Sequence, residues 1–237
     1  RIAFDDRNLT VPIAEFKEAL DNLASPLNMQ YQLRERDDFP NVVIAVSKDD
    51  HCLVSLLTKW KAGVLPINIA AVLSNHPDSQ SLVEWHNIPF HYLPVTKASK
   101  AIQEAQILTI IKETKADLLV LARYMQILSD DLCREISGKA INIHHSLLPG
   151  FKGARPYFQA YDRGIKLVGA TAHYVSDDLD EGPIISQGVE TVDHGYYPKD
   201  LAAKGRDIEC LTLSRAVRCH IEHRIFLHGK KTVVFSK

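Results

Sequence analysis

The sequence has few cysteines and no long apolar run, and each shortage excludes a class of protein. Its 237 residues include four cysteines, none of which forms a CxxC pair: Cys52, Cys133, Cys210 and Cys219. We therefore expect free thiols in a reducing cytoplasm rather than disulfides or a metal cluster. No apolar run approaches the roughly 18 residues that a membrane-spanning helix needs. The first residues also lack the apolar segment of a signal peptide.

An excess of charge of one sign is absent as well. The chain has 28 Lys and Arg residues against 29 Asp and Glu residues, which gives a formal net charge of -1. Because the overall charge does not draw the chain to nucleic acid or to an anionic membrane, we expect neither as a partner. A hydrophobic share of 46% over this length is typical of a globular protein with a sizeable core.

Five apolar runs without polar alternation indicate strands that are covered on both faces. They alternate with segments of helical periodicity, which favours a parallel sheet flanked by helices. The runs are residues 42–47, 65–74, 88–94, 116–122 and 139–145. The expected helices between them include residues 51–62, 99–114 and 129–136. We therefore predict a doubly wound, Rossmann-like α/β unit from residue 40 to about residue 145.

The segments on either side of this unit are less regular. After it, the pattern predicts a helix at 157–165, strands at 167–175 and 184–192, a long helix from Pro198 to near Gly229, and a strand at 230–237. Before it, the pattern predicts a strand at 1–6, a helix at 11–27, a strand at 29–35 and a charged linker at 34–40. We therefore expect two domains, residues 1–38 and 39–237.

Two polar residues, Asn142 and His144, interrupt an otherwise apolar strand in the segment INIHH. Residues two apart on a strand face the same side. Both lie near the carboxyl end of a predicted parallel strand, where open α/β sheets bind their ligands. The pair is therefore either a hydrogen-bonded structural pair at the rim of the sheet or part of a pocket.

A second polar segment, residues 176–183, is an acidic turn. Its acids are Asp177, Asp178, Asp180 and Glu181. Three interpretations of this turn are open. The acids form a solvated loop, they form a divalent-cation site, or one of them supplies a carboxylate that pairs with His144. A cation site needs several converging oxygen ligands, and no further acidic cluster is near. A carboxylate beside an imidazole is suited to general acid–base catalysis near neutral pH.

No nucleophile is evident beside these groups. Ser146 does not lie in a GxSxG elbow, and Cys133 lies on a predicted helix without an evident base. The residues therefore predict acyl transfer or hydrolysis in which water or a substrate group attacks, while Asn142 and His144 stabilise an oxyanion. The turn at 47–51 has no glycine and carries two carboxylates, so it is a poor phosphate cradle.

The segments NIHHSLLPGFKGARP, from Asn142, and GATAHYVSDDLDEGPII, from Gly169, resemble the folate-dependent formyltransferase superfamily. The resemblance extends from Asn41 to the end of the chain. It implies a formyltransferase fold and a folate substrate, with no metal and no further cofactor. Asn142, His144 and Asp180 match the catalytic residues of the superfamily. The residues that match its pterin-binding segments are Met125, Gln126, Leu128, Val175 and Asp177.

Within the superfamily, the chain is similar to the hydrolytic members, which release formate from 10-formyltetrahydrofolate. That activity supplies formate for purine synthesis and balances the one-carbon folate pools. The members that formylate glycinamide ribonucleotide carry a phosphate loop where this chain has SKDDHC, residues 47–52, and typically a Pro where it has His145. The resemblance thus implies water as the acceptor. Transfer to an amine, or folate binding without turnover, are the alternatives.

The hydrolytic members also carry an ACT domain, a small ferredoxin-like ligand-sensing fold of two β-α-β halves. Residues 1–38 resemble only its second half. An isolated half exposes the faces of its sheet and helix, so we expect a partner or further residues to cover them. ACT domains commonly pair, so the resemblance implies a homo-oligomer. No role is assigned to His145 or Arg155.

Overall fold

The structure is a computed structural model that describes residues 2, 4–29, 31, 33, 39–150 and 156–236, with only the backbone of residue 156. The chain divides into two compact units, Arg1–Phe39 and Pro40–Lys237. The division falls next to the domain boundary expected from the sequence. Among the described residues, no helix is both long and apolar enough to cross a membrane.

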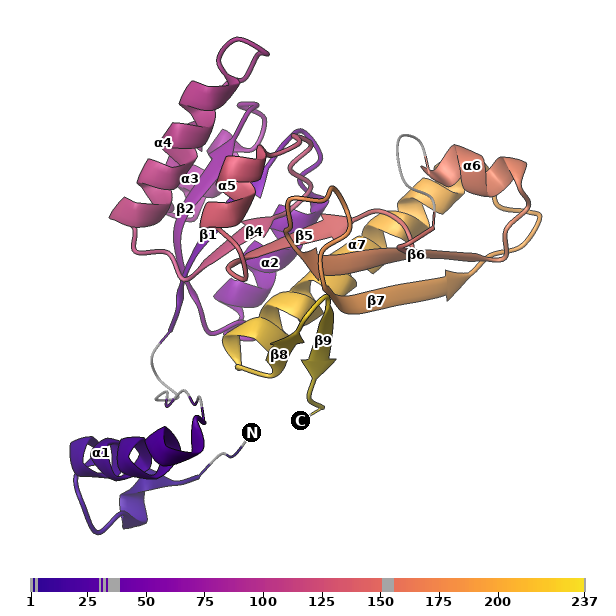
Figure 1. The fold of residues 1–237 in the computed structure, drawn as a ribbon. Coiled ribbons are helices and arrows are strands. Elements are labelled where there is room, and N and C mark those ends of the chain that lie inside the picture. The colour runs from indigo at the N-terminus through magenta and orange to yellow at the C-terminus, as the bar shows by residue number, and fades with distance from the viewer. Residues whose placement is uncertain are drawn as a thin grey trace. The chain divides into compact units, whose positions relative to one another are not determined.

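A seven-stranded sheet forms the centre of the second unit (Figure 1), in the order β3-β2-β1-β4-β5-β6-β7. Its strands are β1 (Asn41–Val46), β2 (Asn68–Ser74), β3 (Phe90–Tyr92), β4 (Leu118–Leu121), β5 (Ala140–His144), β6 (Leu167–Tyr174) and β7 (Ile184–Thr191). The first five strands are parallel, whereas β6 pairs antiparallel with both β5 and β7. The predicted mostly parallel α/β sheet is therefore confirmed.

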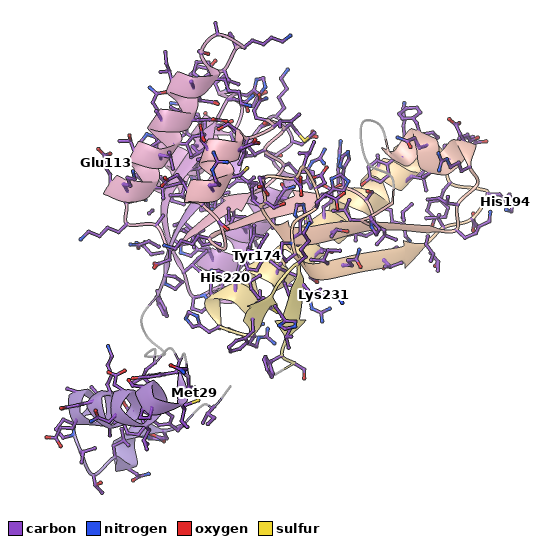
Figure 2. The ribbon with its side chains drawn as sticks, in the orientation of Figure 1. Met29, Glu113, Tyr174, His194, His220 and Lys231 are labelled. Carbon is purple, nitrogen blue, oxygen red and sulfur yellow. The ribbon has the colours of Figure 1, made fainter. Side chains whose placement is uncertain are left out.

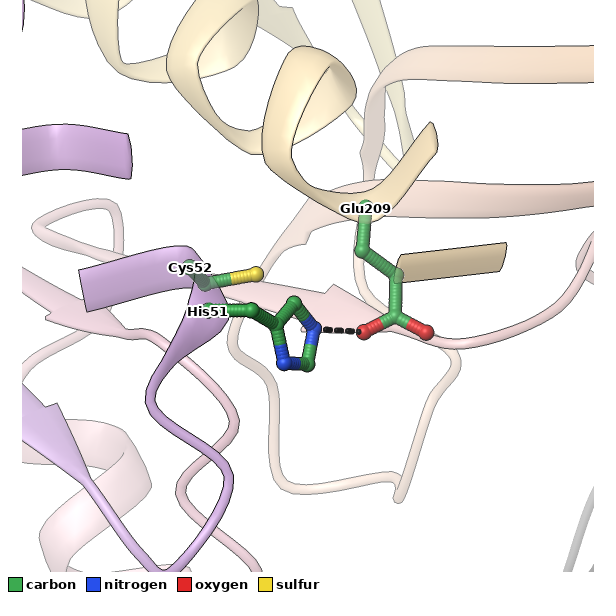
Figure 3. Close-up of side chains that lie close together, drawn as sticks. All are labelled: His51, Cys52 and Glu209. Atoms are coloured by element: carbon green, nitrogen blue, oxygen red, sulfur yellow. Dashed lines mark hydrogen bonds and ion pairs between the residues drawn. The ribbon is translucent and has the colours of Figure 1, made fainter. Parts of the chain in front are cut away.

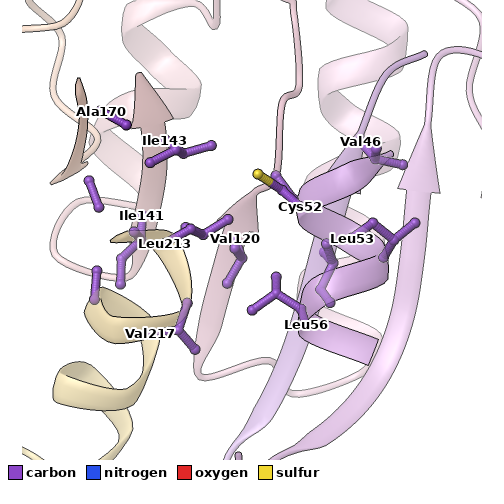
Figure 4. Close-up of a cluster of buried hydrophobic side chains, with 14 of the residues drawn as sticks. Val46, Cys52, Leu53, Leu56, Val120, Ile141, Ile143, Ala170, Leu213 and Val217 are labelled. Atoms are coloured by element: carbon purple, nitrogen blue, oxygen red, sulfur yellow. The ribbon is translucent and has the colours of Figure 1, made fainter. Parts of the chain in front are cut away.

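Helices cover both faces of the sheet, which explains why the strands are apolar throughout rather than alternating. One core cluster joins the sheet to α2 (His51–Lys61), α3 (Gln80–Trp85), α6 (Pro156–Asp162) and α7 (Pro198–Ile221). The other joins it to α4 (Lys100–Glu113) and α5 (Asp130–Glu135). Figure 4 shows Leu53 and Leu56 of α2 and Leu213 and Val217 of α7 around Val120 of β4. The short helix α3 was not predicted from the sequence.

The C-terminal helix ends earlier than predicted. α7 stops at Ile221, and part of the segment expected to continue it forms β8 (Ile225–His228), paired with β9 (Lys231–Val234). His223 takes a left-handed φ of 49°. The N–H groups of His223 and Arg224 donate to the carbonyls of His220 and Cys219, a pattern that closes a helix. The prediction that this helix continues to near Gly229 was wrong. It followed the helical spacing of apolar residues and gave too little weight to the β-branched and aromatic residues of the hairpin, which favour strands.

The first unit contains the predicted helix, α1 (Ile13–Ala24), between the 3-10 turns η1 (Asp6–Asn8) and η2 (Ser25–Leu27). The strands predicted at 1–6 and 29–35 do not form among the residues described there, which are Ile2, Phe4, Asp5, Asp6, Met29, Tyr31 and Leu33. The other residues of these segments, and residues 34–38 of the predicted linker, lie outside the described residues. A strand needs a hydrogen-bonded neighbour, and the described part of this unit offers none.

His220 of α7 makes the stability of the second unit depend on pH. Its Nδ1 lies 2.7 Å from the hydroxyl oxygen of Tyr174 (Figure 2). Burial, followed by the nearby His223, lowers the pKa of His220 to about 4. The unfolded chain therefore binds more protons than the folded one between about pH 6.5 and pH 4, so the free energy of unfolding falls as the pH falls through this window.

We expect His220→Gln to reduce this fall by about 2 kcal/mol between pH 7 and pH 4.5. Half-buried His145 and buried His173 also have lowered pKa values and act in the same direction, so the variant keeps part of the pH dependence. Urea unfolding at the two pH values measures the change, with the exposed His228→Gln as control. Parallel pH dependences for wild type and His220→Gln would refute this assignment.

Candidate active site

Strands β5 and β6 bring the polar residues of the sheet together at the carboxyl end of β5. Their antiparallel register places Asn142 opposite His173 and His144 opposite Thr171. His144 is buried, with 5% of its surface exposed, and Asn142 is half-buried. Because β5 is covered on both faces, these polar side chains are held among apolar neighbours, where each polar atom needs a partner.

The acidic turn after β6 brings one carboxylate to this pair. Asp180 Oδ2 lies 3.3 Å from His144 Nδ1, and Asp180 Oδ1 lies 3.8 Å from His173 Nε2. Asp180 adopts a left-handed φ of 57°, a conformation that costs a non-glycine residue free energy and is often found at functional sites. The structure therefore brings Asn142, His144 and Asp180 together; we call these three side chains the formyl site, after the group on which the resemblance implies that they act.

Two other acids of the turn do not join Asp180. Asp177 and Asp178 are exposed. Among the described residues, the turn supplies no group of ligand atoms that is close enough to hold a metal ion. Of the three interpretations of this turn, the geometry fits the one in which a single carboxylate pairs with His144.

The contact with His144 fixes the charge of Asp180. The hydrogen bond from His144 holds the pKa of Asp180 below its usual value, so the carboxylate is ionised at neutral pH and accepts the Nδ1–H of His144. His144 Nε2 is buried and has no hydrogen-bond partner among the described residues. That nitrogen is therefore the atom that His144 can offer to a bound molecule.

His173 is a site residue to which the sequence analysis gave no role. It is buried, and burial lowers its pKa, so its imidazole is neutral at pH 7. Its Nδ1 lies 2.8 Å from the carbonyl oxygen of Tyr174 and must therefore carry the proton. Its Nε2 then accepts a hydrogen bond from Asn142 Nδ2 at 3.2 Å. This bond orients the Asn142 amide and leaves its second N–H available to a substrate.

Gly182 allows this arrangement. A Cβ atom at this position would lie 1.7 Å from the carbonyl oxygen of Tyr174 and 3.2 Å from His173 Nδ1. Since that carbonyl fixes the tautomer of His173, any side chain at residue 182 would disturb the hydrogen bonds that reach Asn142. The requirement is one of space rather than of backbone conformation.

The residues expected to hold the pterin ring occupy two segments. Met125 is exposed, and its backbone N–H donates to Ser47 Oγ at 2.9 Å. Leu128 and Val175 both pack against the core cluster of α4 and α5. Gln126 is half-buried, and Asp177 is exposed on the acidic turn.

His145 lies beside the formyl site without joining it. Its ring stands 5.1 Å from that of His144 and 6.3 Å from that of Tyr157, centroid to centroid. Burial, and then the charges of Arg123 and His144, lower the pKa of His145 to about 4, so it is neutral at pH 7. Arg155, to which no role was assigned, lies outside the described residues.

Residues 40–217 match the formyl transferase family. The formyltetrahydrofolate deformylase of Corynebacterium sp. (strain P-1) is 57% identical over 221 residues, which cover 93% of this chain and 76% of that protein. The one from Bacillus subtilis (strain 168) is 44% identical over 236 residues, 100% of this chain and 79% of that protein.

A solved structure agrees with these sequence relatives. The crystal structure of formyltetrahydrofolate deformylase from Burkholderia mallei ATCC 23344 superposes with a TM-score of 0.92 at 50% identity. It covers 95% of this chain and 80% of that one. The formyltransferase fold that the resemblance implied is therefore confirmed, and the chain belongs to the formyltetrahydrofolate deformylase family.

Proposed function

We propose that the chain hydrolyses 10-formyltetrahydrofolate to formate and tetrahydrofolate at the formyl site. The observation that carries this proposal is the 3.3 Å approach of Asp180 Oδ2 to His144 Nδ1 beside the Asn142 amide. The relatives described above are named formyltetrahydrofolate deformylase, after the removal of a formyl group from formyltetrahydrofolate. The reaction supplies formate for purine synthesis and balances the one-carbon folate pools.

In the proposed mechanism, water attacks the formyl carbon. Asp180, directly or through His144, takes the proton from the water as the new C–O bond forms. The N–H of Asn142 and the protonated His144 hold the resulting oxyanion. The C–N bond to the folate then breaks as a proton passes to the leaving nitrogen. Formate and tetrahydrofolate are released, and no residue of the chain forms a covalent intermediate.

The folate is proposed to bind between the segments that follow β4 and β6. Met125, Gln126 and Leu128 would contact one side of the pterin ring, and Val175 and Asp177 the other. The packing of Leu128 and Val175 against the same core cluster supports this placement. Because rigid elements hold both segments, the ring would be positioned before the formyl carbon is attacked.

The activity is tested by incubating the purified chain with 10-formyltetrahydrofolate and no amine acceptor. We expect formate and tetrahydrofolate to appear steadily and in equal amounts over many turnovers. If formate appears only after an amine such as glycinamide ribonucleotide is added, the chain is a transferase. Binding of the folate without turnover would instead identify a folate sensor.

We also propose that residues 1–38 are the second half of an ACT-type domain and that the chain forms a homo-oligomer. Several large apolar side chains of α1 and the residues after it are exposed, including Leu23, Leu27 and Met29. Pairing between copies would cover such surfaces. Light scattering after size exclusion tests this, and a monomeric mass at micromolar concentration would contradict it.

A further inference from the structure

Two helices bring four potential metal ligands together outside the formyl site. His51 and Cys52 begin α2, while Glu209 and Cys210 are adjacent on α7. The ligand atoms of His51, Cys52 and Glu209 all lie within 4.8 Å of one another (Figure 3). The thiol of Cys210 donates to the carbonyl oxygen of His51 at 3.3 Å, which brings it beside the other three groups.

We propose that His51, Cys52, Glu209 and Cys210 form a binding site for a thiophilic divalent cation such as Zn²⁺. Two thiolates, one imidazole nitrogen and one carboxylate oxygen are the ligand types that Zn²⁺ takes in proteins, in a set of four. Around a tetrahedral ion these ligand atoms stand roughly 3.3 to 3.8 Å apart, as follows from metal–ligand bonds of about 2.0 to 2.3 Å. The separation of 2.8 Å between His51 Nε2 and Glu209 Oε2 therefore has to widen slightly.

The surroundings of Glu209 suit an ion at this position. The hydroxyl of Tyr157 donates to Glu209 Oε1 at 2.8 Å, which orients the carboxylate and leaves Oε2 directed at His51. Hydrogen bonds of this kind to the outer atoms of ligands hold metal sites in shape. An ion has a route from solvent, because the His51 side chain is 18% exposed and Cys210 is only partly buried.

The charges of the cluster also balance with an ion bound. A Zn²⁺ ion, two thiolates and one carboxylate sum to a net charge of about -1. Arg123 offsets it, because its Nε lies 3.5 Å from Glu209 Oε2 and has no hydrogen-bond partner among the described residues. The second carboxylate that faces Arg123, Asp49, is 47% exposed and contacts its Nη2 at 3.3 Å. Binding would displace the thiol protons of Cys52 and Cys210 to solvent.

The test uses the full chain without an affinity tag, reduced, stripped of metal, and titrated with Zn²⁺ and separately with Co²⁺. We expect one ion per chain and, for Co²⁺, the sulfur-to-metal absorption of thiolate coordination. Cys52→Ser and Cys210→Ser should each weaken binding at least about tenfold and lower that absorption for each bound ion. Cys133→Ser, which alters a buried cysteine elsewhere, should leave both unchanged.

Circular dichroism confirms that each variant is folded, and His51→Gln gives a test that does not alter a cysteine. At the same Zn²⁺ concentration, the Tm should rise more for the wild type and Cys133→Ser than for the other variants. The proposal is overturned if Zn²⁺ does not bind saturably below about 100 µM. That concentration is well above the Kd values typical of protein Zn²⁺ sites. Equal affinity in all variants would also overturn it, since the ion would then lie elsewhere.

Discussion

Asp180→Asn is expected to lower kcat for hydrolysis of 10-formyltetrahydrofolate by about a thousandfold, within the range typical of general acid–base catalysis. The amide has nearly the same shape but cannot accept the water proton. It also removes the negative charge that lies 3.3 Å from His144 Nδ1. Because the site geometry is retained, KM should change much less than kcat. Steady-state formate release measures both constants.

Asp178→Asn is the matched control, since it neutralises an exposed acid of the same turn and should leave kcat within about twofold of the wild type. If Asp180→Asn keeps most of the activity, another acid, such as Asp177, carries the proton. A double variant of Asp180→Asn with His144→Gln should be little slower than the slower single variant, because residues that act as one unit show non-additive losses.

Asn142→Ala is expected to lower kcat by about a hundredfold, equivalent to a barrier raised by about 3 kcal/mol. The substitution removes one donor to the oxyanion, which exists only after water has attacked. It should therefore leave folate affinity little changed. Single-turnover kinetics give the rate, and calorimetric titration with tetrahydrofolate gives the affinity.

Asn68→Ala serves as the control for Asn142→Ala, because Asn68 is exposed at the start of β2. Turnover of Asn142→Ala equal to that of the wild type would remove Asn142 from the mechanism. A loss that appears mainly as weaker folate binding would instead assign it to substrate recognition.

Periodicity and composition predicted the parallel part of the sheet because each strand there is a continuous apolar run. The same reasoning located Asn142 and His144, since polar residues in such a strand are unusual, and it located the turn that contains Asp180. It could not show that β6 runs antiparallel beside β5. That pairing sets Asn142 opposite His173, so the role of His173 depends on a register that is not visible in the local sequence.

Two other features depend on contacts between distant segments. The helical spacing of apolar residues predicted a C-terminal helix that extends beyond Ile221. The β8–β9 hairpin found there depends instead on pairing between the two strands. From the sequence, free thiols are expected because no two cysteines have metal-binding spacing. The proposed cation site combines adjacent ligands from two helices, with His51 and Glu209 separated by 158 residues, a pattern that spacing rules do not detect.

The most direct test is a crystal structure of the chain with a non-hydrolysable analogue of 10-formyltetrahydrofolate. We expect the oxygen that mimics the formyl group within about 2.7 to 3.1 Å of Asn142 Nδ2 and His144 Nε2. We also expect an ordered water molecule between Asp180 and the formyl carbon. A carbonyl bound away from these two nitrogens, or an Asp180 side chain turned away from His144 with no room for water beside it, would contradict the mechanism.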